Sequence, residues 1–122
     1  MERKRIRMFE LKIEKKSNII WVNLIGKLVN PDDAIHLENQ INNELSETIN
    51  NLILNLKDLE YINSSGLNSL IKLFTRSRNL GGDATICNMN QSVKNLVLVT
   101  KLNTVFTITE NINSIDEYIN NK

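Results

Sequence analysis

The stretch from Asn51 to Phe74, NLILNLKDLEYINSSGLNSLIKLF, decides the fold. It opens with the mostly apolar run Asn51 to Leu56, which has the length and composition of a buried strand. From Leu67 onward, apolar residues recur at helical spacing as far as Phe74. Between the two lie Asn63, Ser64 and Ser65, whose side-chain oxygens suit the free N–H groups of a first helical turn. The stretch therefore predicts a strand, a corner and a helix that presents a hydroxyl group at its N-terminus.

The residues before this stretch predict a β-hairpin and a helix. Met8 to Glu14 alternates between apolar and polar residues, Lys15 to Asn18 is a polar turn, and Ile19 to Ile25 is an apolar strand that Gly26 is expected to end. Trp21 is expected to lie partly on the core. Pro31 and two aspartates then favour a helix start, and the apolar spacing predicts a helix from Asp32 to Glu47.

The residues after it predict two more strand and helix units. The central helix should end near Leu80, with Gly81 and Gly82 supplying a left-handed stop. We then expect a strand over Asp83 to Asn88, a helix capped by Ser92 and reaching Leu102, a strand over Val105 to Thr109 and a helix over Ile112 to Ile119.

This alternation predicts an α/β fold in one compact domain over residues 8–122. The opening hairpin and the repeated strand-helix units give a mixed sheet with a parallel core, about five strands and four helices, joined by right-handed crossovers. Residues 1–7 contain Arg3, Lys4, Arg5 and Arg7 and are expected to form a solvated basic arm.

The composition limits the classes of partner that we expect. A net charge of +1 creates no field that would attract nucleic acid or a membrane surface, and no apolar run approaches the roughly 20 residues that span a bilayer. The single cysteine, Cys87, cannot form an internal disulfide and is expected to be a buried core residue. We therefore expect a cytoplasmic protein. Asn occurs 20 times, so any one asparagine is weak evidence by itself.

Catalytic motifs are missing from the sequence. Ser64 is not in a Gly-x-Ser-x-Gly elbow, and the lone histidine, His36, points away from the apolar stripe of its helix. No Cys and His cluster has the spacing of a metal site. We expect no enzyme, no catalytic residues, no metal and no cofactor. Ser64 itself can be read as a structural cap or as an exposed acceptor of a phosphoryl group.

The run from Asn51 to Leu67, together with Gly26-Lys-Leu and Gly81-Gly82, resembles the STAS domain found in bacterial anti-sigma-factor antagonists. The resemblance implies a partner switch without enzymatic activity. In it, the unphosphorylated domain binds a serine-kinase-type anti-sigma factor and frees the sigma factor, phosphorylation of Ser64 ends the binding, and a phosphatase restores it. The implied partner-binding surface consists of Val29, Asn30, Asn63, Ser64, Ser65, Gly66, Leu67 and Asn68.

Two positions depart from the family pattern. Asn63 stands where family members usually have Asp, and Val29 stands where the earlier loop usually has another acid. Loss of those charges would slow or prevent transfer to Ser64 while leaving the binding surface. Alternatives are a constitutive STAS subunit of a larger assembly, such as a lipid-transport or sensor complex, and a small-ligand sensor, which would need a pocket. The sequence leaves open whether the chain forms a homodimer.

Overall fold

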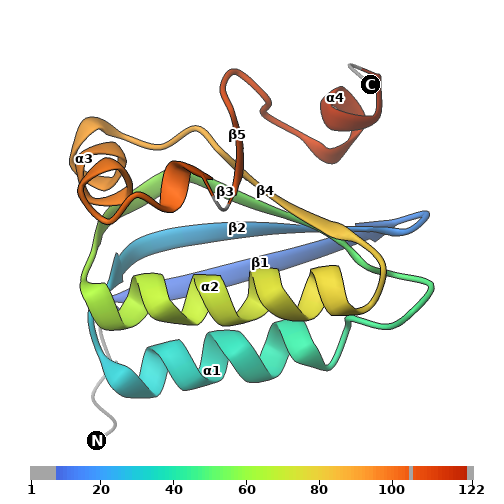
Figure 1. The fold of residues 1–122 in the computed structure, drawn as a ribbon, viewed down its shortest axis with the longest axis horizontal. Helices are drawn as coiled ribbons and strands as arrows, with labels where there is room; N and C mark the ends of the chain where they lie inside the picture. The colour runs from blue at the N-terminus through green and yellow to red at the C-terminus, as the bar shows by residue number, and fades with distance from the viewer. Residues whose placement is uncertain (1–7, 105, 121–122) are drawn as a thin grey trace, which may run out of the picture.

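A five-stranded sheet forms the centre of the protein (Figure 1). The structure is a computed structural model that describes residues 8–104 and 106–120, so the expected basic arm over residues 1–7 lies outside the described residues. The strands follow the chain order β1-β2-β3-β4-β5; β1 and β2 are antiparallel, and the remaining neighbours are parallel. Their bounds are β1 Phe9–Lys16, β2 Ile19–Leu28, β3 Asn51–Ile62, β4 Asp83–Cys87 and β5 Thr107–Thr109.

Four α-helices cover the sheet: α1 Pro31–Asn42, α2 Ser64–Asn79, α3 Gln91–Val99 and α4 Ile115–Asn120. A short 3-10 turn, η1 Leu102–Thr104, follows α3. Figure 1 shows α1 and α2 side by side along one face of the sheet, whereas α4 lies on the other side. The predicted order of strands and helices, and the mixed sheet with a parallel core, are confirmed.

The larger core lies between the sheet and the pair α1 and α2. Alternate residues of β2 and β3 point to this face, because successive side chains of a strand project to opposite sides. Those residues are fully buried: Ile20, Val22, Leu24, Leu52, Leu54 and Leu56. Leu37 of α1 and Leu70 of α2 pack against them, as the helical spacing of apolar residues predicted.

A smaller apolar cluster occupies the second face of the sheet. Trp21 and Ile53 contact Cys87 there, and Ile112 and Ile115 cover them from the C-terminal segment. Trp21 is only 1% exposed, so it is more deeply buried than expected, and its indole N–H donates to the Asn23 side-chain oxygen at 3.0 Å. The second face is therefore sealed over its central strands by α4.

Two strands are longer than predicted. β2 continues through Gly26 to Leu28. Its pairing with β3 shifts register between Asn23 and Ile25 and again between Gly26 and Lys27. Gly26 does not end the strand; it has a φ of +95°, and a Cβ atom there would lie 2.1 Å from the Met8 carbonyl oxygen. β3 likewise runs to Ile62, so Asp58 and Glu60 belong to the strand, where both are exposed.

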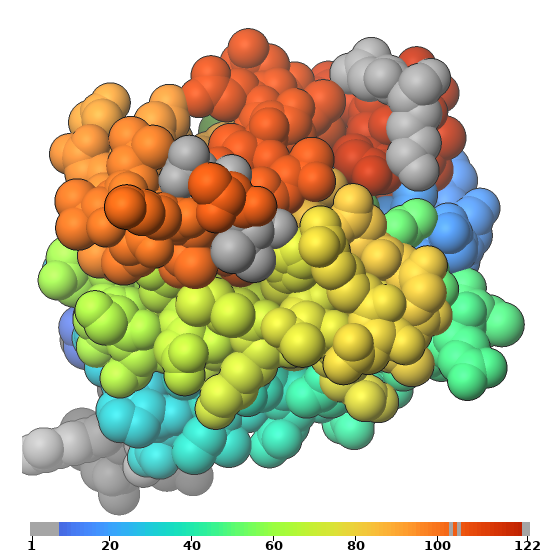
Figure 2. All heavy atoms as spheres, viewed as in Figure 1, coloured from blue at the N-terminus to red at the C-terminus, as the bar shows by residue number. Residues whose placement is uncertain are grey.

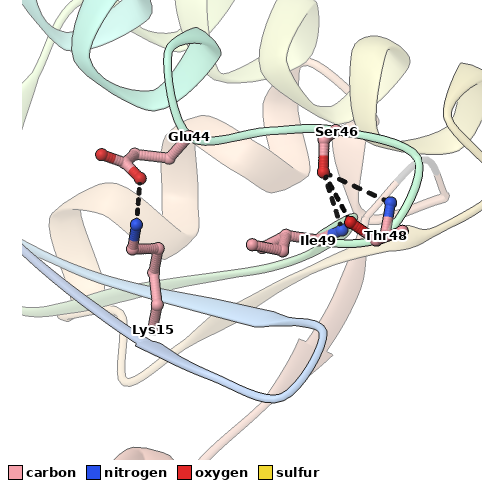
Figure 3. A network of polar contacts seen from close by, with 5 residues as sticks. All are labelled: Lys15, Glu44, Ser46, Thr48 and Ile49. Carbon is pink, nitrogen blue, oxygen red and sulfur yellow. Dashed lines mark hydrogen bonds and ion pairs between the residues drawn. The ribbon is translucent and has the colours of Figure 1, made fainter.

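Helix α1 is shorter than predicted and ends at Asn42 rather than Glu47. Leu45 is buried although it lies outside the helix, which explains why apolar spacing alone overestimated the length. The following loop has its own hydrogen bonds: the Ser46 hydroxyl accepts from the backbone N–H groups of Thr48 and Ile49, at 3.3 and 3.1 Å (Figure 3). Lys15 of β1 also pairs with Glu44 of this loop (Figure 3).

The remaining differences lie in the last third of the chain. Helix α3 is capped by Asn90 and not by Ser92, and it ends at Val99 rather than near Leu102. β5 is described from Thr107, and α4 begins at Ile115 rather than Ile112. α2 ends at Asn79, followed by Gly81 with a φ of +90°, so the predicted left-handed stop is confirmed.

Candidate functional site

The N-terminus of α2 is held in place by both ends of one amide group. The Asn63 side-chain oxygen accepts from the backbone N–H of Gly66 at 2.8 Å, which caps the helix. Its side-chain nitrogen donates to the Val29 carbonyl at 3.1 Å, so the same residue also fixes the loop between β2 and α1. A carboxylate could make the first contact but, lacking a donor, not the second.

Close packing at Gly66 brings the first turn of α2 against the end of β2. A Cβ atom at this position would lie 2.7 Å from the Leu28 carbonyl oxygen and 2.9 Å from the Ile62 Cγ1 atom. Only glycine therefore fits without a shift of the backbone. Leu67 follows with 2% exposure and packs in the core.

Ser64 and Ser65 are both exposed in the first turn of α2. Among the described residues, none forms a hydrogen bond with either hydroxyl group. Ser69 of the same helix is the opposite case: it is 4% exposed and its hydroxyl donates to the Glu38 carboxylate at 2.8 Å. Exposure thus separates the first two serines of α2 from the two buried ones, Ser69 and Ser77.

The helix dipole makes this corner electropositive. α2 has no acidic residue in its first turn, and Arg76 and Arg78 lie in its last turn. α2 itself thus places no carboxylate on its first N–H groups, and their partial positive charge favours a negative group at Ser64.

The structure brings most of the predicted surface together. Asn63 joins the Val29 loop to α2, and the next residue, Asn30, caps α1 by accepting from the Asp32 N–H at 2.9 Å. Asn30 and Asn68 are exposed, and Val29 and Asn63 are partly exposed. Gly66 and Leu67 are buried and support the corner, and their part in partner binding stays a prediction.

Two residues that the sequence analysis did not select also belong to this edge. Tyr61, at the end of β3, is 49% exposed although it is aromatic. Asn90 caps α3, and its amide nitrogen donates to the Leu59 and Glu60 carbonyls, both at 3.1 Å. Strict alternation would place Tyr61 on the side of the buried Leu59, so the strand pattern does not predict its exposure. The contacts of Asn90 join residues 30 and 31 positions apart, which sequence patterns do not reveal.

Cys87 and His36 are the other side chains with reactive groups that the sequence analysis singled out. Burial raises the pKa of the Cys87 thiol to about 12, so the thiol is protonated and unreactive at neutral pH. His36 is exposed on α1. Within residues 8–104 and 106–120, no group of His, Cys, Asp and Glu side chains is arranged to hold a metal ion. No helix in the described part of the chain has the length and apolar character needed to cross a membrane.

Comparison with protein families matches residues 10–115 to the STAS domain. The chain belongs to the STAS domain family. An anti-sigma F factor antagonist of Paenibacillus polymyxa is 24% identical over 114 residues, covering 88% of this chain and 93% of that protein.

Solved structures of STAS domains share the fold. An anti-sigma factor antagonist from Mycobacterium paratuberculosis has a TM-score of 0.74 at 17% identity, covering 93% of this chain and 92% of that one. The antagonist SpoIIAA in its unphosphorylated form has a TM-score of 0.74 at 16% identity, with 93% and 94% of the two chains covered. Phosphorylated SpoIIAA of Bacillus has a TM-score of 0.70 at 15% identity, with 93% and 97% covered. At these identities the structures establish the common fold.

Proposed function

We propose that this STAS domain is an anti-sigma-factor antagonist, a regulator that acts by binding rather than by catalysis. The observation that carries the proposal is the exposed Ser64 hydroxyl at the start of α2, on a backbone fixed by Asn63 and Gly66. The relationship to named antagonists supports the same function. The partner we propose is a serine-kinase-type anti-sigma factor, which docks on Val29, Asn30, Asn63, Ser64, Ser65 and Asn68.

Phosphorylation of Ser64 would release that partner. A phosphoserine carries a charge of about −1.5 to −2 at neutral pH, and the N-terminus of α2 stabilises such a charge by about 0.3–1 kcal/mol. The domain therefore keeps its fold. A partner packed over the corner must instead desolvate the phosphate, which costs several kcal/mol without a matching cation. Charge at one exposed atom thus changes binding and leaves stability unaffected.

Asn63 is consistent with a binding surface that persists without an acidic residue. Its amide satisfies both the Gly66 N–H and the Val29 carbonyl, so the neutral side chain holds the two loops of the surface together. An aspartate would place a carboxylate next to the Val29 carbonyl oxygen, and the two acceptors would repel each other. We propose that Asn63 preserves the geometry of the surface and that phosphoryl transfer to Ser64 is slow.

A charge-mimic variant tests the proposal. Ser64→Asp should weaken binding to the purified kinase-type anti-sigma factor by at least about 100-fold, since the buried charge opposes about 3 kcal/mol of the binding energy. Its free energy of unfolding should stay within about 1 kcal/mol of the parent. Isothermal titration calorimetry and urea unfolding measure the two quantities.

Ser92→Asp is the matched control, because Ser92 is an exposed serine in the first turn of α3. It should bind like the parent. Retained binding by Ser64→Asp would exclude the switch, and equal loss with both variants would show that charge anywhere on this edge blocks the partner.

Incubation with ATP and the anti-sigma factor tests the acceptor itself. Mass spectrometry should find phosphate on Ser64 in the parent and in Ser65→Ala, and none in Ser64→Ala. Phosphate on Ser65 would reassign the acceptor.

A constitutive subunit of a larger assembly is the second candidate. The observation in its favour is the pair of exposed apolar residues at the end of α3, where Leu98 is 53% and Val99 is 80% exposed. Such exposure suits a permanent interface. Stable co-purification with membrane components that survives Ser64→Asp would support this function over the switch.

A further inference from the structure

A groove of about 370 Å³ lies beyond the carboxyl ends of β4 and β5, next to Lys57 in the middle of β3. Lys57, Lys94, Glu110, Asn111 and Asn113 line its rim, and Ser64 is not among the lining residues. β4 leads from the groove into α3 and β5 leads toward α4, on opposite sides of the molecule (Figure 1).

The groove has an excess of positive charge. Lys57 is exposed, and within the described part of the chain it has no ion-pair partner. Lys94 pairs with Glu110, and its hydrogen bond and charge lower the pKa of that carboxyl group. Glu110 is therefore ionised at neutral pH, and among the lining residues two ammonium groups face one carboxylate. A second carboxylate, that of Glu117, lies next to the rim and accepts from the Asn113 N–H at 2.7 Å.

Hydrogen-bond donors complete the rim. The amides of Asn111 and Asn113 are exposed and form no side-chain hydrogen bond to any described residue. Asn88, which directly follows β4, holds the segment from Asn111 to Asn113 in place. Its side-chain amide donates to the Ile112 carbonyl and, at 2.9 Å, to the Asn55 side-chain oxygen. Asn88 also accepts from the Ile112 N–H at 3.4 Å. Donors and cations are thus held on elements that are tied to the sheet.

Met89 adds an apolar surface to this polar rim. It lines the groove and is 9% exposed, directly after Asn88 at the end of β4. A polar rim beside a small apolar surface suits a ligand that has a charged head and a short carbon body.

We infer that the groove binds a small oxyanion, a phosphate or a carboxylate group, between Lys57 and Lys94. On binding, the ammonium of Lys94 turns from Glu110 to the ligand, and the amides of Asn111 and Asn113 donate to its oxygens. The lysines act as point charges, which fits an anion of either geometry. Figure 2 shows the surface of α3 and the segment after β5 from one side, where these elements form the upper part of the molecule. The inference is independent of the function proposed for Ser64.

Titration of isotope-labelled protein by two-dimensional NMR tests the site, with inorganic phosphate and acetate as separate probes. Sodium chloride at the same ionic strength is the reference. Saturable shifts should appear at the backbone amides of Lys57 and of residues 110–113. The stronger response to phosphate or to acetate identifies which oxyanion source the groove prefers.

Charge variants make the test specific. Lys57→Gln should weaken binding about fivefold, as expected for loss of one exposed charge contact. Glu110→Gln should tighten it by a similar factor, because it frees Lys94 for the ligand. Lys72→Gln, on the outer side of α2, is the matched control and should change nothing.

Three results would overturn the inference. They are shifts that never saturate, equal weakening by Lys57→Gln and Lys72→Gln, and an unchanged or weaker affinity in Glu110→Gln. The first two would indicate an adventitious ion only, and the third would show that Lys94 takes no part.

Discussion

Helices α2 and α3 start with the same capping geometry but present different surfaces. The side-chain oxygens of Asn63 and Asn90 each accept from an N–H three residues later, both at 2.8 Å. Their amide nitrogens each donate to strand or loop carbonyls at 3.1 Å. The asparagine cap is therefore part of the scaffold at both helices and does not by itself mark a binding site.

The residues after the two caps differ. Gly66 presses α2 against the Leu28 carbonyl, whereas Val93 at the same position of α3 is a buried core side chain. Ser64 follows the first cap, and Gln91 follows the second. The comparison teaches that the functional character of the α2 corner comes from a small hydroxyl on a closely packed turn, and not from the cap.

Replacing Gly66 should break the α2 corner most strongly. Gly66→Ala gains about 1 kcal/mol in helix propensity but introduces steric contacts that cost about 3 kcal/mol, because its Cβ meets a backbone carbonyl. We expect a net loss of about 2 kcal/mol in the free energy of unfolding, measured by urea denaturation. Ser65→Ala, one residue earlier and exposed, should stay within about 0.5 kcal/mol. A Gly66→Ala protein as stable as the parent would show that the packing at Leu28 is not tight.

Removal of each cap should separate structure from binding. Asn63→Ala and Asn90→Ala should each lower the free energy of unfolding by about 1 kcal/mol, since each loses a helix cap and leaves carbonyl groups unpaired. Only Asn63→Ala should also weaken binding to the anti-sigma factor, because only the Asn63 side chain fixes the Val29 loop. Urea unfolding and calorimetric titration provide the two values. Equal loss of binding with Asn90→Ala would extend the contact surface to α3.

The sequence predicted the order of elements because the periods of two and 3.6 residues are local properties. The ends of elements depend on distant contacts. β2 continues beyond Gly26, where the Met8 backbone lies too close for any side chain. α1 ends at Asn42, although Leu45 is still buried in the core. Neither contact changes the spacing of apolar residues in the sequence nearby.

For the candidate site, too, the sequence predicted the features that depend on neighbouring residues and missed those that depend on distant contacts. Ser64 was placed at a helix start by the residues around it, and it is exposed there. Leu67 was predicted on the apolar stripe of the helix and is 2% exposed. Its place in the partner-binding surface follows only from the family resemblance and stays a prediction. The asparagines were discounted because they are frequent in the sequence, yet Asn30, Asn63 and Asn90 cap three of the four α-helices. Composition alone could not reveal these roles, which depend on carbonyls that only the fold brings close.

The smallest expected effect tests whether the two caps belong to one cooperative unit. Cys87 is buried three residues before Asn90, and its raised pKa of about 12 keeps the native thiol protonated at pH 8. A disulfide reagent should therefore modify the native protein only through unfolding. If unfolding is two-state, a loss of about 1 kcal/mol raises the modification rate about fivefold, and equally in Asn63→Ala and Asn90→Ala. A larger increase in the Cys87 modification rate in Asn90→Ala alone would show that the region around Cys87 and the start of α3 opens independently of α2. The starts of α2 and α3 would then differ in dynamics as well as in surface.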